Sequence, residues 1–113
     1  MTLNAQLKGA APVFAALGDE TRLQLVARLA GGRALSISRL SQGAGITRQA
    51  VTKHLHVLAC AGLVRGCRLG REQIWELNAE QLAQARRCLD TVGRQWESAL
   101  DRLKKAVEGE EEA

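Results

Sequence analysis

The stretch from residue 36 to residue 77 constrains the fold more than any other part of the chain, because its apolar spacing changes there from a helical to an alternating period. Val51, Leu55 and Leu58 recur at helical spacing. Thr47 stands where its hydroxyl can cap the first turn of such a helix. Gly62 follows the last apolar residue and tolerates the left-handed conformation that often ends a helix. The sequence therefore predicts a helix between Thr47 and Gly62.

A shorter helical pattern precedes this helix. Ser36 is placed to cap a segment that carries Ile37 and Leu40, and the residues Gly43-Ala44-Gly45 supply a tight turn before the next cap. A helix, a glycine turn and a second capped helix form the order of a helix-turn-helix. We therefore predict a helix-turn-helix over residues 36–62.

The apolar period becomes alternating after Gly62. Residues 63–68 and 73–77 have the pattern of two short strands, and residues 69–72 between them contain Gly70. This pattern predicts a hairpin, or wing, over residues 63–77. Arg65, Arg68 and Arg71 are expected on or near its tip, where three cations can reach a phosphate backbone or a minor groove.

Positive charge concentrates in the same region. Residues 33–75 contain seven Lys or Arg and one acid, Glu72, for a net charge of +6, whereas residues 1–32 carry +1 and residues 76–113 carry −3. A local cluster of this kind is what neutralising phosphates requires. Together with the helix-turn-helix, it predicts a double-stranded DNA partner and the following contact residues: Ser38, Thr47, Arg48, Gln49, Thr52, Lys53, His54, Arg65, Arg68 and Arg71. His56 falls on the same polar helix face, and His54 is expected to pack or to contact phosphate.

Two further helices are expected before this region. Asp19 precedes a helical pattern over residues 20–29 that stops at Gly31-Gly32. Residues 11–17 form a short apolar segment with Pro12 at the first helical position, and residues 3–9 can be helical as well.

The last pattern is the longest in the chain. Asn78 is placed to cap a helix over residues 79–107, whose apolar stripe is too long for a domain of this size to cover by itself. We expect residues 11–17 and 79–107 to form a homodimer, and residues 108–113 to be a frayed acidic tail. Trp75 and Trp96 are both expected to be structural. The expected dimer residues are Phe14, Leu82, Leu89, Val92, Trp96, Leu100 and Leu103.

Length and composition limit the number of domains and the class of protein. The 113 residues, of which 46% are hydrophobic, suit one domain over 1–113 that is mainly α-helical with a small β-hairpin wing. No apolar run is long enough to cross a bilayer and no signal peptide is recognisable, so we expect a cytoplasmic protein without a membrane partner. The chain has no Tyr, two His and no convergent set of acid, base and nucleophile, which argues against an enzyme.

Four blocks of the sequence together resemble ArsR-type (ArsR/SmtB-like) bacterial repressors. They are ALGDETRL at residues 16–23, QAVTKHLHVL at 49–58, AGLV at 61–64, and GR at 70–71 before WEL at 75–77. The resemblance covers roughly residues 11–107. It implies a homodimeric winged helix-turn-helix repressor whose first and last helices form the dimer and whose helix from Thr47 enters the major groove.

The chain departs from this family at the metal ligands. The metal-sensing members carry a Cys-x-Cys pair on the first helix of the helix-turn-helix, where this chain has Ser36 and Ser38. A neutral hydroxyl does not replace a thiolate for a soft metal, and no histidine follows His56. We therefore expect no metal site and no cofactor, and the effector stays unknown.

The function predicted is a sequence-specific DNA-binding regulator, a repressor that binds an inverted-repeat operator as a homodimer. One alternative is a winged-helix module that docks a protein, although such a surface would present apolar anchors where Gln49, Thr52 and Lys53 stand. The other is a repressor that responds to thiol oxidation. For that role Cys88 is adjacent to Arg86-Arg87 and can meet its symmetry mate, whereas Cys60 and Cys67 are expected to fill small gaps in the core.

Overall fold

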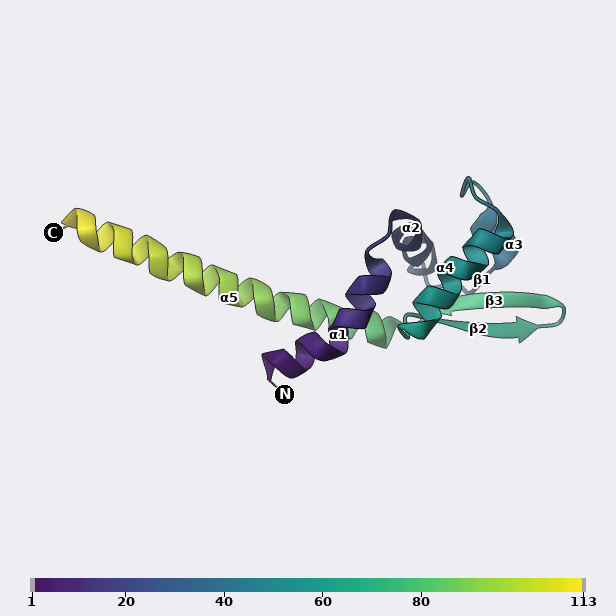
Figure 1. Cartoon of the computed structure of the whole chain (residues 1–113), viewed down its shortest axis with the longest axis horizontal. Coiled ribbons are helices and arrows are strands. Elements are labelled where there is room, and N and C mark those ends of the chain that lie inside the picture. The colour runs from purple at the N-terminus through teal and green to yellow at the C-terminus, as the bar shows by residue number, and fades with distance from the viewer. Residues whose placement is uncertain (1, 113) are drawn as a thin grey trace.

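A computed structural model describes residues 2–112 of the chain, and the side chains of residues 2–109. The elements follow the order of a winged helix-turn-helix, with five helices and one three-stranded antiparallel sheet (Figure 1), so the predicted fold class is confirmed. They are α1 (Leu3–Leu17), α2 (Glu20–Leu29), β1 (Leu35–Ser36), α3 (Ile37–Ser41), α4 (Arg48–Cys60), β2 (Val64–Leu69), β3 (Glu72–Leu77) and α5 (Ala79–Glu112).

The core lies where α2, α3 and α4 meet the base of the sheet. Val51, Leu55 and Leu58, the three apolar positions predicted on α4, are fully buried. Leu40 of α3 and Leu63 before β2 are buried with them. Burying a side chain of this size contributes about 1.5–3 kcal/mol, so this cluster fixes α4 against the sheet with its polar face outward.

The predicted helix caps are present. The Thr47 hydroxyl accepts a hydrogen bond from the Ala50 backbone N–H at 3.1 Å, and the Ser36 hydroxyl accepts one from the Arg39 N–H at 3.2 Å. Asp19 caps α2 in the same way through the Arg22 N–H at 3.0 Å. These three bonds fix where α2, α3 and α4 begin.

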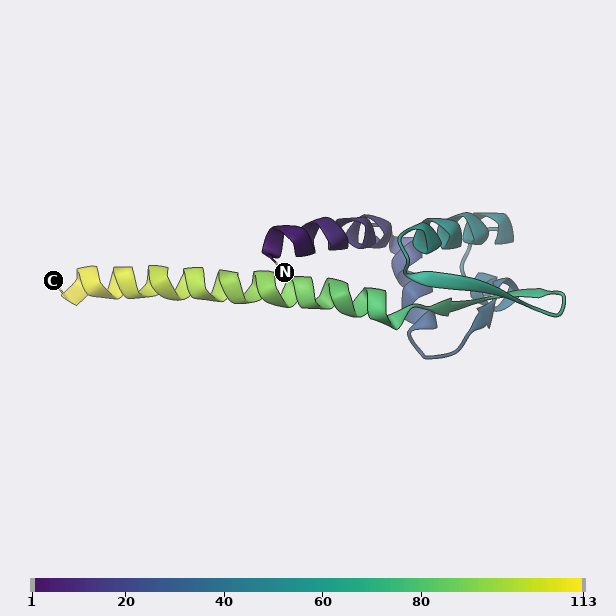
Figure 2. The same ribbon diagram turned by 90° about the horizontal axis from the view of Figure 1, so that it is seen from below.

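The sheet has one strand that the sequence does not predict. The strand order is β1-β3-β2, and the two-residue β1 pairs with β3 through Leu35 opposite Trp75 and Ser36 opposite Ile74. The β2–β3 hairpin is paired from Val64 opposite Leu77 to Leu69 opposite Glu72, as the alternating pattern predicts. Beyond the core, the hairpin projects past the helices as a wing (Figure 2).

Helix α1 differs from the expected 11–17 segment. It is continuous from Leu3, which confirms that residues 3–9 are helical, and Pro12 lies inside it rather than at its first position. A proline within a helix removes one backbone hydrogen bond. The packing of α1 against α5, with Ala10, Val13 and Ala16 buried, offsets this cost.

Helix α5 lies against α1 only near its beginning. Ala85 and Cys88 are buried there, and the rest of the helix projects away from the other elements (Figure 1). The chain consequently extends 74 Å along its longest axis. The helix continues to Glu112, so the tail expected from residue 108 is not frayed up to that residue, and Ala113 lies outside the described residues. None of the helices within residues 2–112 is long and apolar enough to cross a membrane.

A glycine in the wing fixes the place of Trp75. A Cβ at Gly66 would lie 3.1 Å from two carbons of the Trp75 ring and 2.7 Å from the Gln73 Nε2. We expect Gly66→Ala to lower the free energy of unfolding by about 1–3 kcal/mol, because the buried ring cannot move without opening the core. Urea unfolding followed by Trp fluorescence measures this change.

The matched control is Gly9→Ala in α1, where the added Cβ meets nothing within 4 Å. Alanine in a helix is favoured over glycine by up to about 1 kcal/mol, so this variant is expected to be as stable as the parent or more stable. Equal losses in the two variants would contradict the role given to Gly66.

Candidate nucleic-acid interface

The exposed face of α4 forms one wall of an open groove. Six residues line this groove, five from α4 and one from the start of α3: Ile37, Arg48, Gln49, Thr52, Lys53 and His56. Four of the predicted contact residues, Arg48, Gln49, Thr52 and Lys53, are therefore brought together. We call this set of six residues the α4 groove.

Hydrogen bonds hold the start of the α4 groove in place. The Arg48 guanidinium donates to the Ser38 hydroxyl across the helix-helix turn at 2.8 Å, and the Thr52 hydroxyl donates to the Arg48 carbonyl at 2.9 Å. Ser38 thus positions Arg48, while the Thr47 hydroxyl is engaged in the helix cap. Arg48, Gln49 and Lys53 are exposed within this frame.

His56 belongs to the groove although the list of predicted contacts omits it. Its ring centroid lies 5.9 Å from that of Trp75, with the two planes tilted by 57°. The imidazole that lines the groove therefore packs beside a buried indole. The sequence indicates this place for His56 through its spacing. His56 follows Thr52 by four residues and Gln49 by seven, which places all three on one helix face.

His54 does not line the α4 groove, and its contacts fit the packing role that is one of the two expected for it, whereas its contact with phosphate stays a prediction. Its Nδ1 lies 3.4 Å from a guanidinium nitrogen of Arg22 and 3.9 Å from a carboxylate oxygen of Asp19, so it joins α4 to the start of α2. The backbone N–H of Arg22, which donates to the Asp19 carboxylate, holds the pKa of Asp19 below its ordinary value of 3.8. The hydrogen bond between the Arg22 N–H and the ionised Asp19 carboxylate stabilises the fold above pH 3.8. This stabilisation is lost as the pH falls through the lowered pKa of Asp19.

The three wing arginines do not form one cluster. Arg65 lies opposite Glu76 near the base of the hairpin and makes an ion pair with it at 3.4 Å, which corrects its expected place near the tip. Arg68 lies one pair before the last rung of the hairpin, and Arg71 stands in the two-residue tip beside Gly70. Both are exposed, so the cations that project farthest from the core are Arg68 and Arg71.

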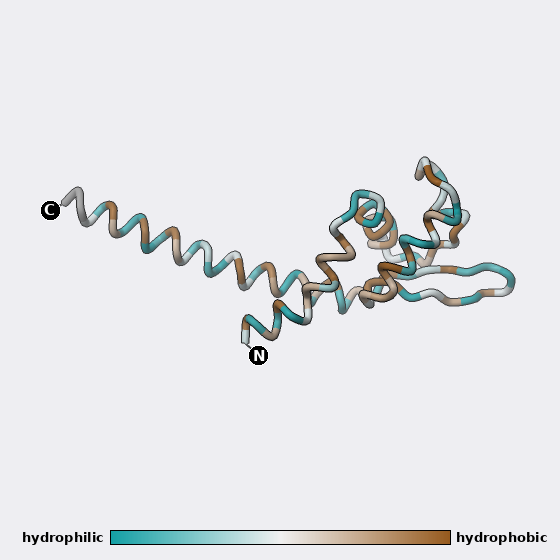
Figure 3. The backbone as a smooth tube through the Cα atoms, in the orientation of Figure 1, coloured by the Kyte–Doolittle hydropathy of each residue, from teal (hydrophilic) through white to brown (hydrophobic). Residues whose placement is uncertain are grey.

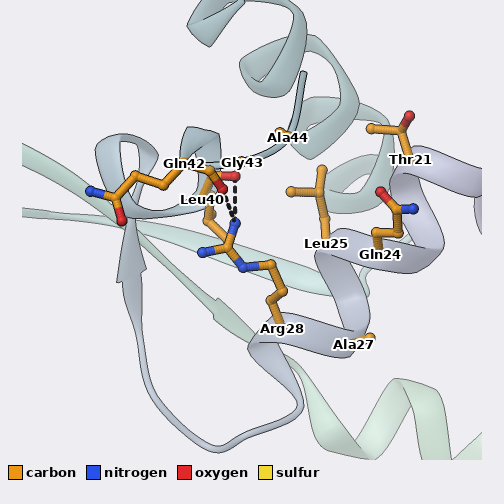
Figure 4. A pocket seen from close by; sticks show the side chains of 9 residues that line it. All are labelled: Thr21, Gln24, Leu25, Ala27, Arg28, Leu40, Gln42, Gly43 and Ala44. Carbon is orange, nitrogen blue, oxygen red and sulfur yellow. Dashed lines mark hydrogen bonds between the residues drawn. The ribbon is translucent and has the colours of Figure 1, made fainter. Parts of the chain in front are cut away.

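An arginine of α2 that the sequence analysis does not single out supports the helix-turn-helix. The Arg28 guanidinium donates to the Leu40 carbonyl at 2.8 Å, the Gln42 carbonyl at 3.3 Å and the Arg39 carbonyl at 2.6 Å. Figure 4 shows Arg28 reaching from α2 toward the residues that end α3. The last carbonyls of a helix have no hydrogen-bond partner within the helix, and a cation at that end also interacts favourably with the helix dipole. Arg28 therefore fixes α3 against α2.

We expect Arg28→Met, which keeps the length of the side chain, to lower the free energy of unfolding by about 1–3 kcal/mol because three carbonyls lose a charged donor. Thermal and urea unfolding measure the loss. The control is Arg33→Met in the loop that precedes β1, an exposed position where the change is expected to stay within about 0.5 kcal/mol. A loss at position 33 as large as that at position 28 would argue against this role.

The cysteines are placed differently from the expectation. Cys60 and Cys67 are exposed rather than filling gaps in the core, and Cys88 is buried within the protomer, where α5 meets α1. Within residues 2–112, His, Cys, Asp and Glu side chains form no group of three or more that could hold a metal ion. The structure thus brings no thiol pair or ligand cluster to the α4 groove.

The expected dimer residues fall into two groups. Phe14 and Leu82 pack partly on the protomer's own core, and Val92 is half-buried. The other four lie exposed along α5: Leu89, Trp96, Leu100 and Leu103. Trp96 is 65% exposed, so it is not part of the protomer's core as expected. The large apolar surface that the protomer leaves uncovered is therefore on α5.

Known proteins are similar to this chain both in sequence and in fold. A model of the helix-turn-helix domain family matches residues 17–67. The HTH-type transcriptional regulator Rv2034 of Mycobacterium tuberculosis is 36% identical over 95 residues, which span 84% of this chain and 85% of that protein.

Solved structures of transcriptional regulators are similar to this chain as well. The ArsR-like transcriptional regulator from Rhodococcus sp. RHA1 matches with a TM-score of 0.75 and 35% identity, over 89% of this chain and 94% of that one. The homodimeric winged helix-turn-helix DNA-binding domain of Mb0332 from Mycobacterium bovis, a possible ArsR-family transcriptional regulator, matches with a TM-score of 0.62 and 25% identity over 88% of each chain. The first two relatives are named as transcriptional regulators, and the Mycobacterium bovis domain is named as a DNA-binding domain. The chain belongs to the ArsR-like family of winged helix-turn-helix transcriptional regulators.

Proposed function

We propose that this regulator is a repressor that binds an inverted-repeat operator as a homodimer in the cytoplasm. In this proposal the α4 groove contacts base edges in the major groove, and Arg68 and Arg71 hold the flanking backbone or minor groove. The observation that carries the proposal is the α4 groove itself, in which a buried apolar face fixes α4 and leaves the amide of Gln49 and the cations of Arg48 and Lys53 exposed. Polar groups of this kind recognise base edges, and a fixed helix makes the recognition specific.

The polarity of the α4 groove favours DNA over a protein partner. Ile37 is its one large apolar residue and is half-buried at the start of α3. Protein-docking surfaces rely on aromatic and aliphatic anchors near their centre, whereas the residues that line this groove include the polar Gln49, Thr52 and Lys53. The charge of the wing adds a contribution to DNA affinity that falls with salt.

Homodimerisation is supported by the uncovered apolar stripe of α5 and by the homodimeric Mycobacterium bovis relative. Two copies related by a twofold axis present two α4 grooves, which match two half-sites of opposite orientation.

The test is selection of bound fragments from random duplex DNA with the full chain, followed by light scattering of the free protein. We expect an imperfect inverted repeat to be enriched and the free protein to have the mass of a dimer at micromolar concentration. Enrichment of a single, non-repeated motif, or no enrichment at all, would overturn the proposed operator. Transcription of a reporter placed behind the selected site then separates repression from activation.

Metal ions are expected to leave operator binding unchanged. Ser36 caps α3 and Ser38 accepts a hydrogen bond from Arg48, so both hydroxyls are engaged and neither is a thiolate. We expect titration with Zn(II), Cd(II) or As(III) at modest excess to change the operator Kd by less than about twofold, which is within 0.5 kcal/mol. Stoichiometric metal binding that releases DNA would contradict this prediction.

A further inference from the structure

A cavity of about 460 Å³ lies between α2 and the turn that joins α3 to α4 (Figure 4), and we call it the α2 cavity. Its lining comes from α2, from Leu40 at the end of α3 and from the turn itself. It includes no residue of the α4 groove, the wing or α5, so neither the DNA contacts nor the homodimer proposed above uses it. Its volume is within the range of about 300–1,000 Å³ that is typical of small-molecule sites.

The buried part of the α2 cavity is apolar. Leu25 and Leu40 are 2% and 0% exposed, and Ala44 is half-buried. Figure 3 shows apolar residues recurring between polar ones along α2, so this helix packs on the core and still presents polar side chains to the cavity. Those side chains include the Thr21 hydroxyl and the Gln24 amide. An apolar interior with a few polar groups is typical of sites for small organic molecules.

The charge of the α2 cavity favours an anion. Arg28 is the one charged residue among the described residues that line it, and none of the ion pairs within residues 2–109 involves Arg28. A guanidinium has five N–H groups, and Arg28 makes three hydrogen bonds, all to backbone carbonyls at the end of α3 and in the turn. A carboxylate suits such a partner because it accepts two parallel N–H bonds from a guanidinium.

We propose that the α2 cavity binds a small organic carboxylate with an apolar body, and that its binding weakens the affinity of the protein for the operator. The carboxylate pairs with Arg28, and the apolar body lies against Leu25 and Leu40. The binding site stands on the cavity alone, whereas the effect on the operator rests on the proposed function. A molecule of this class acts as an inducer of the repressor.

Arg28 connects the α2 cavity to the helix that contacts DNA. Both edges through which a guanidinium binds a carboxylate include its Nη2 atom, and in Arg28 this atom donates to the Arg39 carbonyl at 2.6 Å. An anion and the end of α3 therefore compete for the same nitrogen. Helix α3 carries Ser38, which accepts a hydrogen bond from Arg48 at 2.8 Å, so a shift of α3 displaces a side chain of the α4 groove. The coupling thus runs through contiguous contacts.

The turn after α3 has room for such a shift. Gly43 and Gly45 have φ of +70° and +72°, and a Cβ added at either would meet nothing within 4 Å. The hydrogen bond from Arg28 to the Gln42 carbonyl at 3.3 Å ties this turn to α2. Weakening that bond lets the turn move without displacing atoms packed beside its glycines.

Binding is tested on the full chain without DNA. The probes are phenylacetate, indole-3-acetate and octanoate, each titrated to about 10 mM while backbone amide chemical shifts are followed by NMR. We expect at least one probe to give saturable shifts that include Leu25, Leu40 and Ala44, and its neutral amide to bind about tenfold more weakly or worse. Acetate, which has the charge but no apolar body, is expected not to bind. The absence of saturable shifts at these residues with all three probes would overturn the proposed site, and equal affinity for the amide would overturn the preference for an anion.

Two variants distinguish binding in the α2 cavity from binding elsewhere. Ala27→Leu narrows the cavity from an exposed position and Arg28→Met removes its charge, so each is expected to raise the Kd of the probe about tenfold or more. The matched controls are Ala30→Leu and Arg33→Met, which lie outside the lining and are expected to leave this Kd unchanged. Ala27→Leu decides the result if Arg28→Met does not fold. Parental affinity of Ala27→Leu for the probe would overturn the site.

Fluorescence anisotropy with the selected operator tests the coupling. Saturation with the probe that binds most tightly is expected to raise the operator Kd about tenfold, which is within the range common for allosteric coupling. The same concentration of acetate corrects for ionic strength. A probe that occupies the cavity but leaves the operator Kd unchanged, or lowers it, would overturn the coupling. A parent protein that binds no operator would overturn the proposed function and not the site, because the titration without DNA measures the site separately.

Discussion

Replacing Trp96 by aspartate is expected to convert the protein to a monomer and to abolish operator binding together with it. Trp96 is 65% exposed in the protomer, so the monomer loses no internal packing, whereas the dimer would have to bury a carboxylate in an apolar stripe. A truncated central anchor commonly costs about 2–4 kcal/mol, so we expect the dimer dissociation constant to rise by about thirtyfold or more. Light scattering and fluorescence anisotropy with labelled operator measure both effects.

The control for this variant is Ser98→Asp, which adds the same charge two residues away, outside the stripe. It is expected to remain dimeric and to bind the operator as the parent does. A Trp96→Asp protein that is monomeric but still binds operator with parental affinity would show that one copy is sufficient for operator binding. A Trp96→Asp protein that remains dimeric would place the interface elsewhere.

Removing one side chain from the α4 groove and removing one from the wing are expected to weaken DNA binding in different ways. Gln49→Ala removes an amide near the start of α4, so it should cost about 1–3 kcal/mol on the operator and relax the sequence preference. Arg71→Ala removes a cation from the wing tip, so it should weaken binding to all duplexes more evenly and flatten the salt dependence by about one unit of slope. Titration of operator and scrambled duplex across a salt series measures both.

Arg65→Ala is the matched control for the wing. Arg65 is already paired with Glu76 at 3.4 Å, so it contributes less free charge than Arg71 and its loss should change the salt slope less. If Arg65→Ala and Arg71→Ala change the slope equally, the wing acts through its total charge and not through its tip. If Gln49→Ala leaves the sequence preference intact, α4 does not supply the specificity.

The local features of the fold could be predicted from the sequence because their causes lie within a few residues. Thr47, Ser36 and Asp19 each cap a helix through a backbone N–H three residues ahead, and such a signal is visible in the chain itself. The burial of Val51 and Leu55 follows in the same way from helical periodicity. Local signals of this kind are enough to predict the winged helix-turn-helix fold.

The features that could not be predicted depend on partners distant in the sequence. Strand β1 is two residues long, too short for a period, and exists because β3 offers Trp75 and Ile74 as partners. The Arg28 guanidinium binds carbonyls eleven or more residues ahead, and His54 turns toward Arg22. Neither contact is visible in the local spacing of residues, so the sequence predicts neither the partner of His54 nor the role of Arg28.

The projecting part of α5 also has a consequence for the geometry of the operator. In the proposed homodimer, moving the twofold axis by one residue along α5 moves the two DNA-contacting heads apart by about 3 Å, since the helix rises about 1.5 Å per residue in each copy. One base pair of duplex DNA rises about 3.4 Å, so the register of α5 measures half-site spacing in steps close to one base pair. Seven residues inserted in α5 would separate the heads by about 21 Å, or about six base pairs, which is more than half of the 10–10.5 base pairs in a helical turn. The second half-site would then face away from the protein, so the length of this helix acts as a gauge of operator phase.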